Sequence, residues 1–343
     1  MSGRLEPGQE RRRRGLVYLA VLLAAGVLVL AAVLVGDPTL TNAASHAGST
    51  PHAVAAARSE RTGASAVPRA STSAGARSTP TGSEIKWSSK TYSMTFDGLT
   101  RNYMVFTPGL VSASQLPVVV ELGGCCTTVG VEVARADFRQ VASPAILVYP
   151  EYVDGNWNAG ACCGTPATDH IDDAGFVNAV ISQIKDSEPE ASQGPVYLAG
   201  YSNGGKLAMM LACQNPSQFA AVAVYGATRT SDCPTVDSES VLVMAGSADP
   251  GTAISGTPVV QNGYTEPTVD ELVADYRSAD GCSQAAVTKV LGTATETLWG
   301  ECQGARQVAE VVYQGDNHTW PETSGPTPSA QAVMWSFFAS LGA

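Results

Sequence analysis

Short apolar runs alternate with longer amphipathic segments from residue 84 onward, and the two patterns predict strands and helices. Two segments, 92–96 and 101–108, alternate apolar and polar residues, as half-exposed antiparallel strands do. Later runs are continuous and rich in valine, which is typical of strands buried on both faces: 117–122, 145–150, 195–200, 220–226, 241–246 and 308–315. Helix-like segments lie between or after them: 173–186, 206–214, 267–279 and 329–341. This alternation predicts an α/β fold, with a mostly parallel sheet covered by helices on both faces and antiparallel strands at its start.

The first residues of the chain have a different pattern. Four consecutive arginines, Arg11 to Arg14, precede the uncharged apolar run 16–35. A helix of that length, at about 1.5 Å per residue, reaches the ~30 Å of a bilayer's hydrocarbon core. Since arginines favour the cytoplasmic side, we expect a cytoplasmic basic tail over 1–14 and an uncleaved signal anchor over 15–36. A long cleavable signal peptide is the alternative.

Residues 37–83 are dominated by Ala, Ser, Thr, Gly and Pro, with no apolar periodicity. Such a segment buries too little surface to offset the entropy of ordering, so we expect a disordered stalk. His46 and His52 lie in it and are excluded as catalytic residues, because a disordered tether cannot hold a general base in place. Residues 84–343 are then one extracytoplasmic domain, anchored to the membrane through the N-terminal helix alone, or secreted after cleavage.

The charge of this domain argues against one class of partner. Residues 84–343 hold 11 Lys and Arg against 27 Asp and Glu, a net formal charge of −16. A surface this acidic repels phosphate backbones, so nucleic-acid binding is not expected.

All eight cysteines lie in the expected exported domain, and their even number favours disulfides. A zinc site is less favoured, because adjacent cysteines do not easily chelate one metal tetrahedrally and no C-x-x-C spacing is present. Proximity along the chain suggests two pairings, Cys213 with Cys233 and Cys282 with Cys302. This leaves the two vicinal pairs, Cys125–Cys126 and Cys162–Cys163, to bridge to each other.

One serine stands where a buried strand gives way to a helix. Gly200-Tyr201-Ser202-Asn203-Gly204 fits the G-x-S-x-G pattern of a sharp strand-to-helix turn, in which small neighbours leave the serine hydroxyl exposed. Ligands bind beyond the carboxyl ends of strands in such sheets, and the start of a helix stabilises an oxyanion. Ser202 is therefore the expected nucleophile.

A serine needs a base and an acid to be activated. Outside the stalk only two histidines remain, and His318, which follows the last expected strand, satisfies the chain order serine, acid, histidine, whereas His170 does not. Asp249, directly after the strand at 241–246, is the expected acid. Other carboxylates are interpreted as surface groups or, for the last, as too near His318 in sequence: Asp232, Asp237, Asp270, Asp275 and Asp316.

These residues carry a family resemblance. From about residue 92 the chain resembles the poly(3-hydroxybutyrate) depolymerases and the type-1 feruloyl and acetylxylan esterases, a group of α/β-hydrolases. The likeness rests on six ordered blocks: RNYMVFTP, PVVVELGGC, GNWNAGACCG with DDAGFV, GYSNGGKLA, GSADP and GDNHTWP. It implies that Ser202 is the nucleophile, Asp249 the acid and His318 the base.

The resemblance also implies an oxyanion hole and a substrate-binding wall. Backbone N–H groups of Cys125 and Asn203 would form the hole. Gly123 stands where the group usually has a histidine, but a backbone donor does not require that side chain, so the hole is expected to be kept. Trp157, Tyr201 and Trp320 would contact the substrate, with core packing as the alternative for both tryptophans. The cysteines at 162 and 163 would lie beside this wall.

The expected function is that of an exported serine esterase, which uses no metal and no organic cofactor. Its ester would be of feruloyl, acetyl or hydroxyalkanoate type, and small or soluble, because Ala343 directly follows the last expected helix. Two alternatives stay open: a non-catalytic binding protein with a hydrolase fold, and an acyltransferase or peptidase that uses the same three residues.

Overall fold

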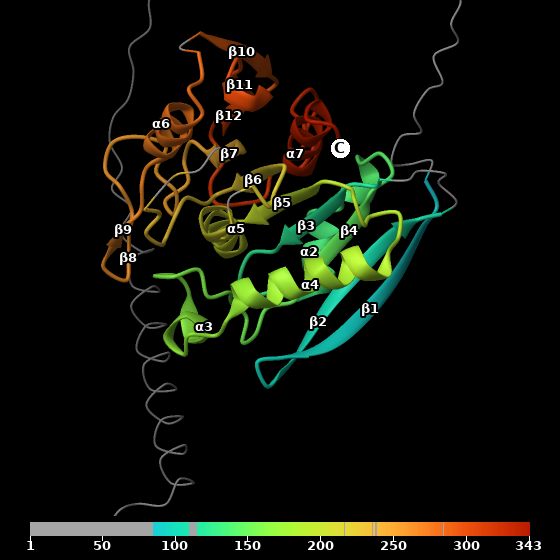
Figure 1. Ribbon diagram of the computed structural model, residues 1–343. Coiled ribbons are helices and arrows are strands. Elements are labelled where there is room, and N and C mark those ends of the chain that lie inside the picture. The colour runs from blue at the N-terminus through green and yellow to red at the C-terminus, as the bar shows by residue number, and fades with distance from the viewer. Residues whose placement is uncertain (1–84, 110–114, 216, 235, 237–238, 284) are drawn as a thin grey trace, which may run out of the picture. The chain divides into compact units, whose positions relative to one another are not determined.

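A ten-stranded sheet forms the centre of the computed structural model, which describes residues 85–109, 115–215, 217–234, 236, 239–283 and 285–343 (Figure 1). Its strand order is β1-β2-β4-β3-β5-β6-β7-β12-β11-β10. Six central strands run parallel to one another: β4 (Ile146–Pro150), β3 (Val118–Leu122), β5 (Val196–Tyr201), β6 (Ala221–Tyr225), β7 (Ser240–Gly246) and β12 (Val308–Tyr313). The predicted α/β-hydrolase fold is confirmed.

Antiparallel strands form both edges of the sheet. At one edge lie β1 (Trp87–Phe96) and β2 (Leu99–Pro108), as the alternating pattern predicted. At the other lie β11 (Ala294–Trp299) and β10 (Ala286–Leu291), which sequence analysis did not predict. Most of β10 is exposed, and an edge strand that buries so little carries no continuous apolar run. A separate short hairpin joins β8 (Val260–Gln261) to β9 (Tyr264–Thr265).

Helices cover both faces of the sheet (Figure 1). One face packs against α4 (Asp173–Ser187), α5 (Ser202–Gln214) and α6 (Val269–Ala279). The other packs against α2 (Val129–Arg135), η2 (Phe138–Gln140) and α7 (Ala330–Ser340). Successive strand residues alternate between the two cores, because side chains of a strand point to opposite faces: Val118 and Val120 face the first core and Val119 the second. Two short helices, α3 (Gly164–Thr168) and η3 (Gln303–Ala305), lie in connecting segments.

The register of the parallel strands aligns their carboxyl ends. Leu122 at the end of β3 pairs with Gly200 near the end of β5, and Tyr201 pairs with Tyr225 at the end of β6. Gly246 at the end of β7 pairs with Tyr313 at the end of β12. The loops that leave these strands therefore start from one edge of the sheet, where ligands bind in folds of this class.

Two of the expected disulfides are present, Cys213–Cys233 and Cys282–Cys302. The expected bridge between the vicinal pairs is wrong: Cys162 is bonded to its neighbour Cys163, whereas Cys125 and Cys126 form no disulfide.

The two vicinal pairs lie in different surroundings. Cys162 is buried beside the side-chain amide of Asn203, whose nitrogen lies 3.7 Å from the sulfur. Cys126 is exposed, and its N–H donates to the carbonyl of Gly155. The two pairs therefore lie in different environments, and the nearest thiol for Cys162 is that of the next residue.

No helix among the described residues is long and apolar enough to cross a membrane. The expected tail, signal anchor and stalk, residues 1–83, lie outside the described residues.

Loss of either long-range disulfide should lower stability by about 3 kcal/mol, because each closes a loop of similar length in the unfolded chain. Both bridges join cysteines 20 residues apart. We expect the Cys213→Ser/Cys233→Ser and Cys282→Ser/Cys302→Ser variants to show similar decreases in the free energy of unfolding, measured by urea denaturation. A large difference between the two variants would contradict a loop-closure origin.

Candidate active site

The turn between β5 and α5 is very tight. Ser202 is the first residue of α5 and has a φ of +52°, in the left-handed region that non-glycine residues rarely adopt. A Cβ at Gly200 would lie 2.6 Å from the Cα of Gly205, and one at Gly204 would collide with the carbonyl oxygen of Leu122. The glycines of the motif are therefore required by close backbone approaches, and the serine side chain is presented at the edge of the sheet.

Ser202, His318 and Asp249 lie in one hydrogen-bonded chain. The Ser202 Oγ lies 2.7 Å from Nε2 of His318, and Nδ1 of His318 lies 2.7 Å from Oδ2 of Asp249. Since a carboxylate only accepts, Nδ1 carries the proton and Nε2 is left to accept the serine proton. The other carboxylate oxygen accepts the N–H of Gly251 at 2.7 Å. The side chain of Asp249 is fully buried whereas a third of the His318 side chain is exposed, so a substrate has access to the base and not to the acid.

The other histidines and carboxylates considered as base or acid are not part of this hydrogen-bonded chain. His170 is exposed and lines a separate hollow with Asp172 and Asp173. Asp275 pairs with Arg229, and the side chain of Asp316 lines a pocket described below. Asp237, His46 and His52 are outside the described residues.

Two tyrosines fix the loop that carries His318. The hydroxyl of Tyr201 donates to the carbonyl of His318 at 2.5 Å, and that of Tyr225 donates to the carbonyl of Asn317 at 3.0 Å. Burial raises the pKa of both tyrosines, so both remain protonated donors. Tyr201 is only 9% exposed. Tyr201 therefore makes a structural contact that holds the base in place, and its contact with substrate stays a prediction.

The loop after β3 lies directly against the nucleophile. A Cβ on Gly124 would be 2.6 Å from the ring of Tyr201 and 3.5 Å from the Cβ of Ser202. Within the described part of the chain, the N–H groups of Cys125 and Asn203 have no hydrogen-bond partner. Both expected oxyanion donors are thus unpaired, one in this loop and one in the first turn of α5.

Gly123 is required by the packing of a buried glutamate. A Cβ at Gly123 would lie 2.8 Å from Cδ of Glu132 and 2.9 Å from Oε2, and closer still to Cγ. Glu132 cannot easily move, because its carboxylate accepts from Nη1 of Arg135 at 2.7 and 2.9 Å and from the hydroxyl of Thr127. The glutamate therefore occupies the space of the missing side chain, and the hydrogen bond from Thr127 connects it to this loop.

The two tryptophans are buried. Trp157 is 0% exposed, so its ring forms no wall of an open pocket, and the core-packing alternative applies to it. Trp320 is 4% exposed and packs edge-on against Tyr201 and Tyr225 while its indole N–H donates to Gln331. Trp320 also borders the pocket beside the His318 loop.

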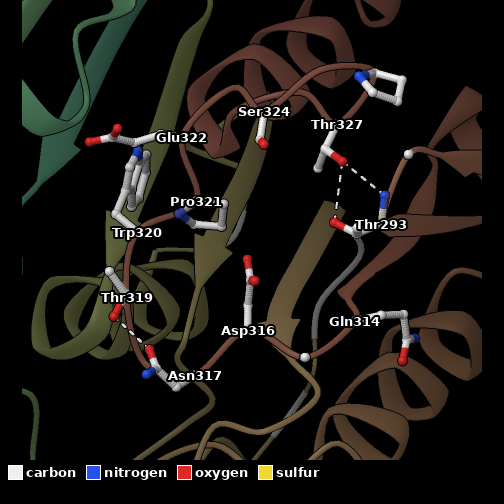
Figure 2. Close-up of a pocket in the computed structure, with 13 residues that line it drawn as sticks. Thr293, Gln314, Asp316, Asn317, Thr319, Trp320, Pro321, Glu322, Ser324 and Thr327 are labelled. Atoms are coloured by element: carbon white, nitrogen blue, oxygen red, sulfur yellow. Dashed lines mark hydrogen bonds between the residues drawn. The ribbon is translucent and has the colours of Figure 1, made fainter.

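That pocket has a volume of about 780 Å³ and is shown in Figure 2. Asn317 and Thr319, which flank His318 in sequence, line it, and Asp316 lies between the Trp320 side and the Thr293–Thr327 side. The lining combines carboxylate, amide and hydroxyl groups with apolar surface, including one tryptophan. It suits a polar group with several hydrogen-bonding positions.

Comparisons with known proteins find relatives that are named as esterases. No family model matches the chain. It is 30% identical over 221 residues to "Putative esterase NocK" of Nocardia uniformis, covering 59% of this chain and 62% of that protein. It is 27% identical over 198 residues to "Probable feruloyl esterase C" of Aspergillus flavus, covering 57% of this chain and 64% of that protein. The matches thus span less than two thirds of either relative.

Among solved structures, the acetyl xylan esterase of Aspergillus awamori superposes with a TM-score of 0.48 at 16% identity, covering 72% of this chain and 99% of that one. The resemblance seen in the sequence is confirmed by the named relatives.

Gly123→Ala should slow any reaction that uses the loop after β3. The added methyl group must displace either Glu132 or the loop, and loss of one oxyanion donor costs on the order of 10²–10³ in kcat. We expect a decrease in kcat of about 10-fold or more, within that limit, in steady-state ester hydrolysis. Gly130→Ala is the matched control, since a Cβ there meets nothing closer than 3.9 Å. Equal activity of the two variants would contradict the packing argument.

Glu121→Gln should stabilise the protein at high pH only. Glu121 is 1% exposed, and neither carboxyl oxygen has a hydrogen-bond partner among the described residues. Burial, with the nearby charge of Glu132, raises the pKa of Glu121 well above 4.5, so the folded state holds this proton while the unfolded state releases it. Stability is therefore lost as the pH rises above the unfolded value.

The two proteins should melt at the same temperature near pH 4. At pH 8 the Gln variant should melt higher, by roughly 2–4 °C per kcal/mol of relieved cost. Calorimetry at the two pH values measures this difference. The same change in melting temperature at both would show that ionisation of Glu121 is not its cause.

Proposed function

We propose that this chain, an α/β-hydrolase related to the feruloyl esterases, is a serine carboxylic-ester hydrolase that works through an acyl-enzyme. The observation that supports it most is the unbroken chain of hydrogen bonds from Ser202 through His318 to the buried Asp249. The three groups come from segments far apart in sequence, after β5, β7 and β12. Packing alone does not require them to meet in this order.

The first half of the proposed reaction forms the acyl-enzyme. The Oγ of Ser202 attacks the ester carbonyl while Nε2 of His318 takes its proton, and Asp249 stabilises the imidazolium that results. The carbonyl oxygen becomes an oxyanion, which accepts hydrogen bonds from the N–H groups of Cys125 and Asn203. When the tetrahedral intermediate collapses, the C–O bond to the alcohol breaks and His318 returns the proton to the leaving oxygen.

The second half releases the acid. Water enters, His318 removes one proton from it, and the hydroxide oxygen attacks the acyl carbonyl. The Ser202 ester bond breaks, and the serine oxygen recovers its proton from His318. Every proton moves between groups of this chain, substrate and water, so the chemistry needs no metal or organic cofactor.

The acyl group we propose is of feruloyl, acetyl or hydroxyalkanoate type. The printed name of the Aspergillus flavus relative supports the first of these. The pocket beside Asn317 and Thr319, which offers amide, hydroxyl and carboxylate groups, is a candidate site for the alcohol portion. A panel of esters that share one alcohol and differ in the acyl group separates the three classes by kcat/KM.

We also propose that residues 84–343 act outside the cytoplasm. Two long-range disulfides in this segment support an oxidising compartment. The arginines and the apolar run before residue 36 support attachment through the segment 15–36, with 37–83 as a tether. N-terminal sequencing of the protein recovered from cell envelopes tests whether that segment is retained.

Ser202→Ala should abolish ester hydrolysis, with kcat falling on the order of 10⁶-fold, and Asp249→Asn should lower it on the order of 10⁴-fold. Hydrolysis of p-nitrophenyl acetate by the full chain measures both effects. Ser336→Ala is the matched control, because that serine lies on α7 and its hydroxyl donates only to the carbonyl of Ala332. Wild-type rates in Ser202→Ala would disprove the proposed function, as would failure of the wild-type protein to react with a serine-directed fluorophosphonate.

A further inference from the structure

Trp157 connects the two segments that carry the proposed oxyanion donors. Its main chain is held by the side chain of Asn203: the N–H of Trp157 donates to Oδ1 at 2.7 Å, and Nδ2 donates to the carbonyl of Trp157 at 3.0 Å. Its indole N–H donates to the carbonyl of Gly123 at 3.0 Å. One buried residue is therefore hydrogen-bonded on one side to the start of α5 and on the other to the loop after β3.

The hydrogen bonds of this linkage are buried. Trp157 is 0% and Asn203 2% exposed, so water does not compete for these bonds. The ring of Trp157 packs edge-on against Tyr152, whose hydroxyl contacts the backbone of Thr127 in the same loop. The indole is thus fixed in orientation by a second contact to the segment that it holds.

The two donors sit at the two ends of this linkage. Asn203 itself supplies one N–H, and its side chain makes the contact to Trp157. Cys125 supplies the other, two residues beyond the carbonyl of Gly123 that receives the indole hydrogen bond. An oxyanion hole works only when both N–H groups lie within hydrogen-bonding distance of the same oxygen, so the separation of these two segments must be fixed.

We propose that Trp157 is a positioning residue of the oxyanion hole, and that the Asn203–Trp157–Gly123 linkage sets the distance between the N–H groups of Cys125 and Asn203. This inference rests on the proposed function. It gives Trp157 a role other than substrate contact. It also explains why a position next to the nucleophile carries a side-chain amide, since Asn203 accepts from the N–H and donates to the carbonyl of the same residue.

Two single variants break the linkage at different points. Trp157→Phe removes the indole N–H and keeps an aromatic ring in the core. Asn203→Ala removes the contact to the main chain of Trp157 and keeps the backbone N–H of residue 203, so the donor itself is unchanged. Trp335→Phe is the matched control, since Trp335 is a 6% exposed tryptophan on α7.

Loss of transition-state stabilisation should change kcat and the affinity for a transition-state analogue, and should leave KM nearly unchanged. Trp157→Phe and Asn203→Ala should each lower kcat for p-nitrophenyl acetate about 10- to 100-fold with KM changed less than about threefold. The inhibition constant of a trifluoromethyl ketone, which forms a tetrahedral adduct with Ser202 and has no leaving group, should rise by the same factor as kcat/KM falls. Trp335→Phe should lower the melting temperature and change neither quantity.

The double variant tests whether the two contacts act through one linkage. The Trp157→Phe/Asn203→Ala variant should lose little more activity than the more affected single variant, because either change already frees the loop. Multiplicative losses, a change confined to KM, or unchanged ketone affinity would overturn the inference. If Trp157→Phe does not fold, the kcat and ketone affinity of Asn203→Ala decide the question alone.

Failure of the inference and failure of the proposed function give different results. If the wild-type protein hydrolyses no ester and binds no ketone, the proposed function is wrong, and the inference falls with it. If the wild-type protein is active and both single variants keep its kcat, the function stands and the positioning role of Trp157 is disproved.

Discussion

The close approach of the β5–α5 turn to the end of β3 is the constraint on which the site depends. Leu122 and Gly200 are paired in register, and Gly204 comes so near the carbonyl of Leu122 that no side chain fits there. This contact brings the loop after β3 next to Ser202. The same turn places Ser202 in a left-handed conformation, a local cost that the surrounding sheet and helix offset.

Buried polar groups around this turn hold the segments that converge on it. The Tyr201 hydroxyl holds the carbonyl of His318. Lys206, four residues after the nucleophile, pairs with Glu266 at 2.5 Å with both side chains buried, which ties α5 to the segment before α6. Removing one partner of such a pair typically costs about 3–5 kcal/mol. These two buried contacts therefore connect α5 and its N-terminal turn to the His318 loop and to the segment before α6.

Strands with a continuous apolar sequence were predicted correctly. The burial of Trp157, which depends on partners distant in the sequence, was not. Valine-rich runs marked all six central strands, because complete burial demands an apolar sequence. The exposed β10 gave no such signal. The sequence around Trp157 identified an aromatic residue in a family block, but its partners, Gly123 and Asn203, are 34 and 46 positions away. Nothing local indicates that it is fully buried.

The sequence by itself determined the order of β1, β2, the six central strands and the helices α4 to α7, the tight turn at Ser202, the separate compositions of residues 1–83 and 84–343, and a short set of possible bases and acids. These follow from backbone preferences and from burial, which act over a few residues. Only the tertiary structure decided that Asp249 and His318 meet Ser202, that Cys162 bonds Cys163, and that Glu132 occupies the space beside Gly123. Those outcomes depend on strand register and on side chains from distant segments sharing one volume, which no local pattern specifies.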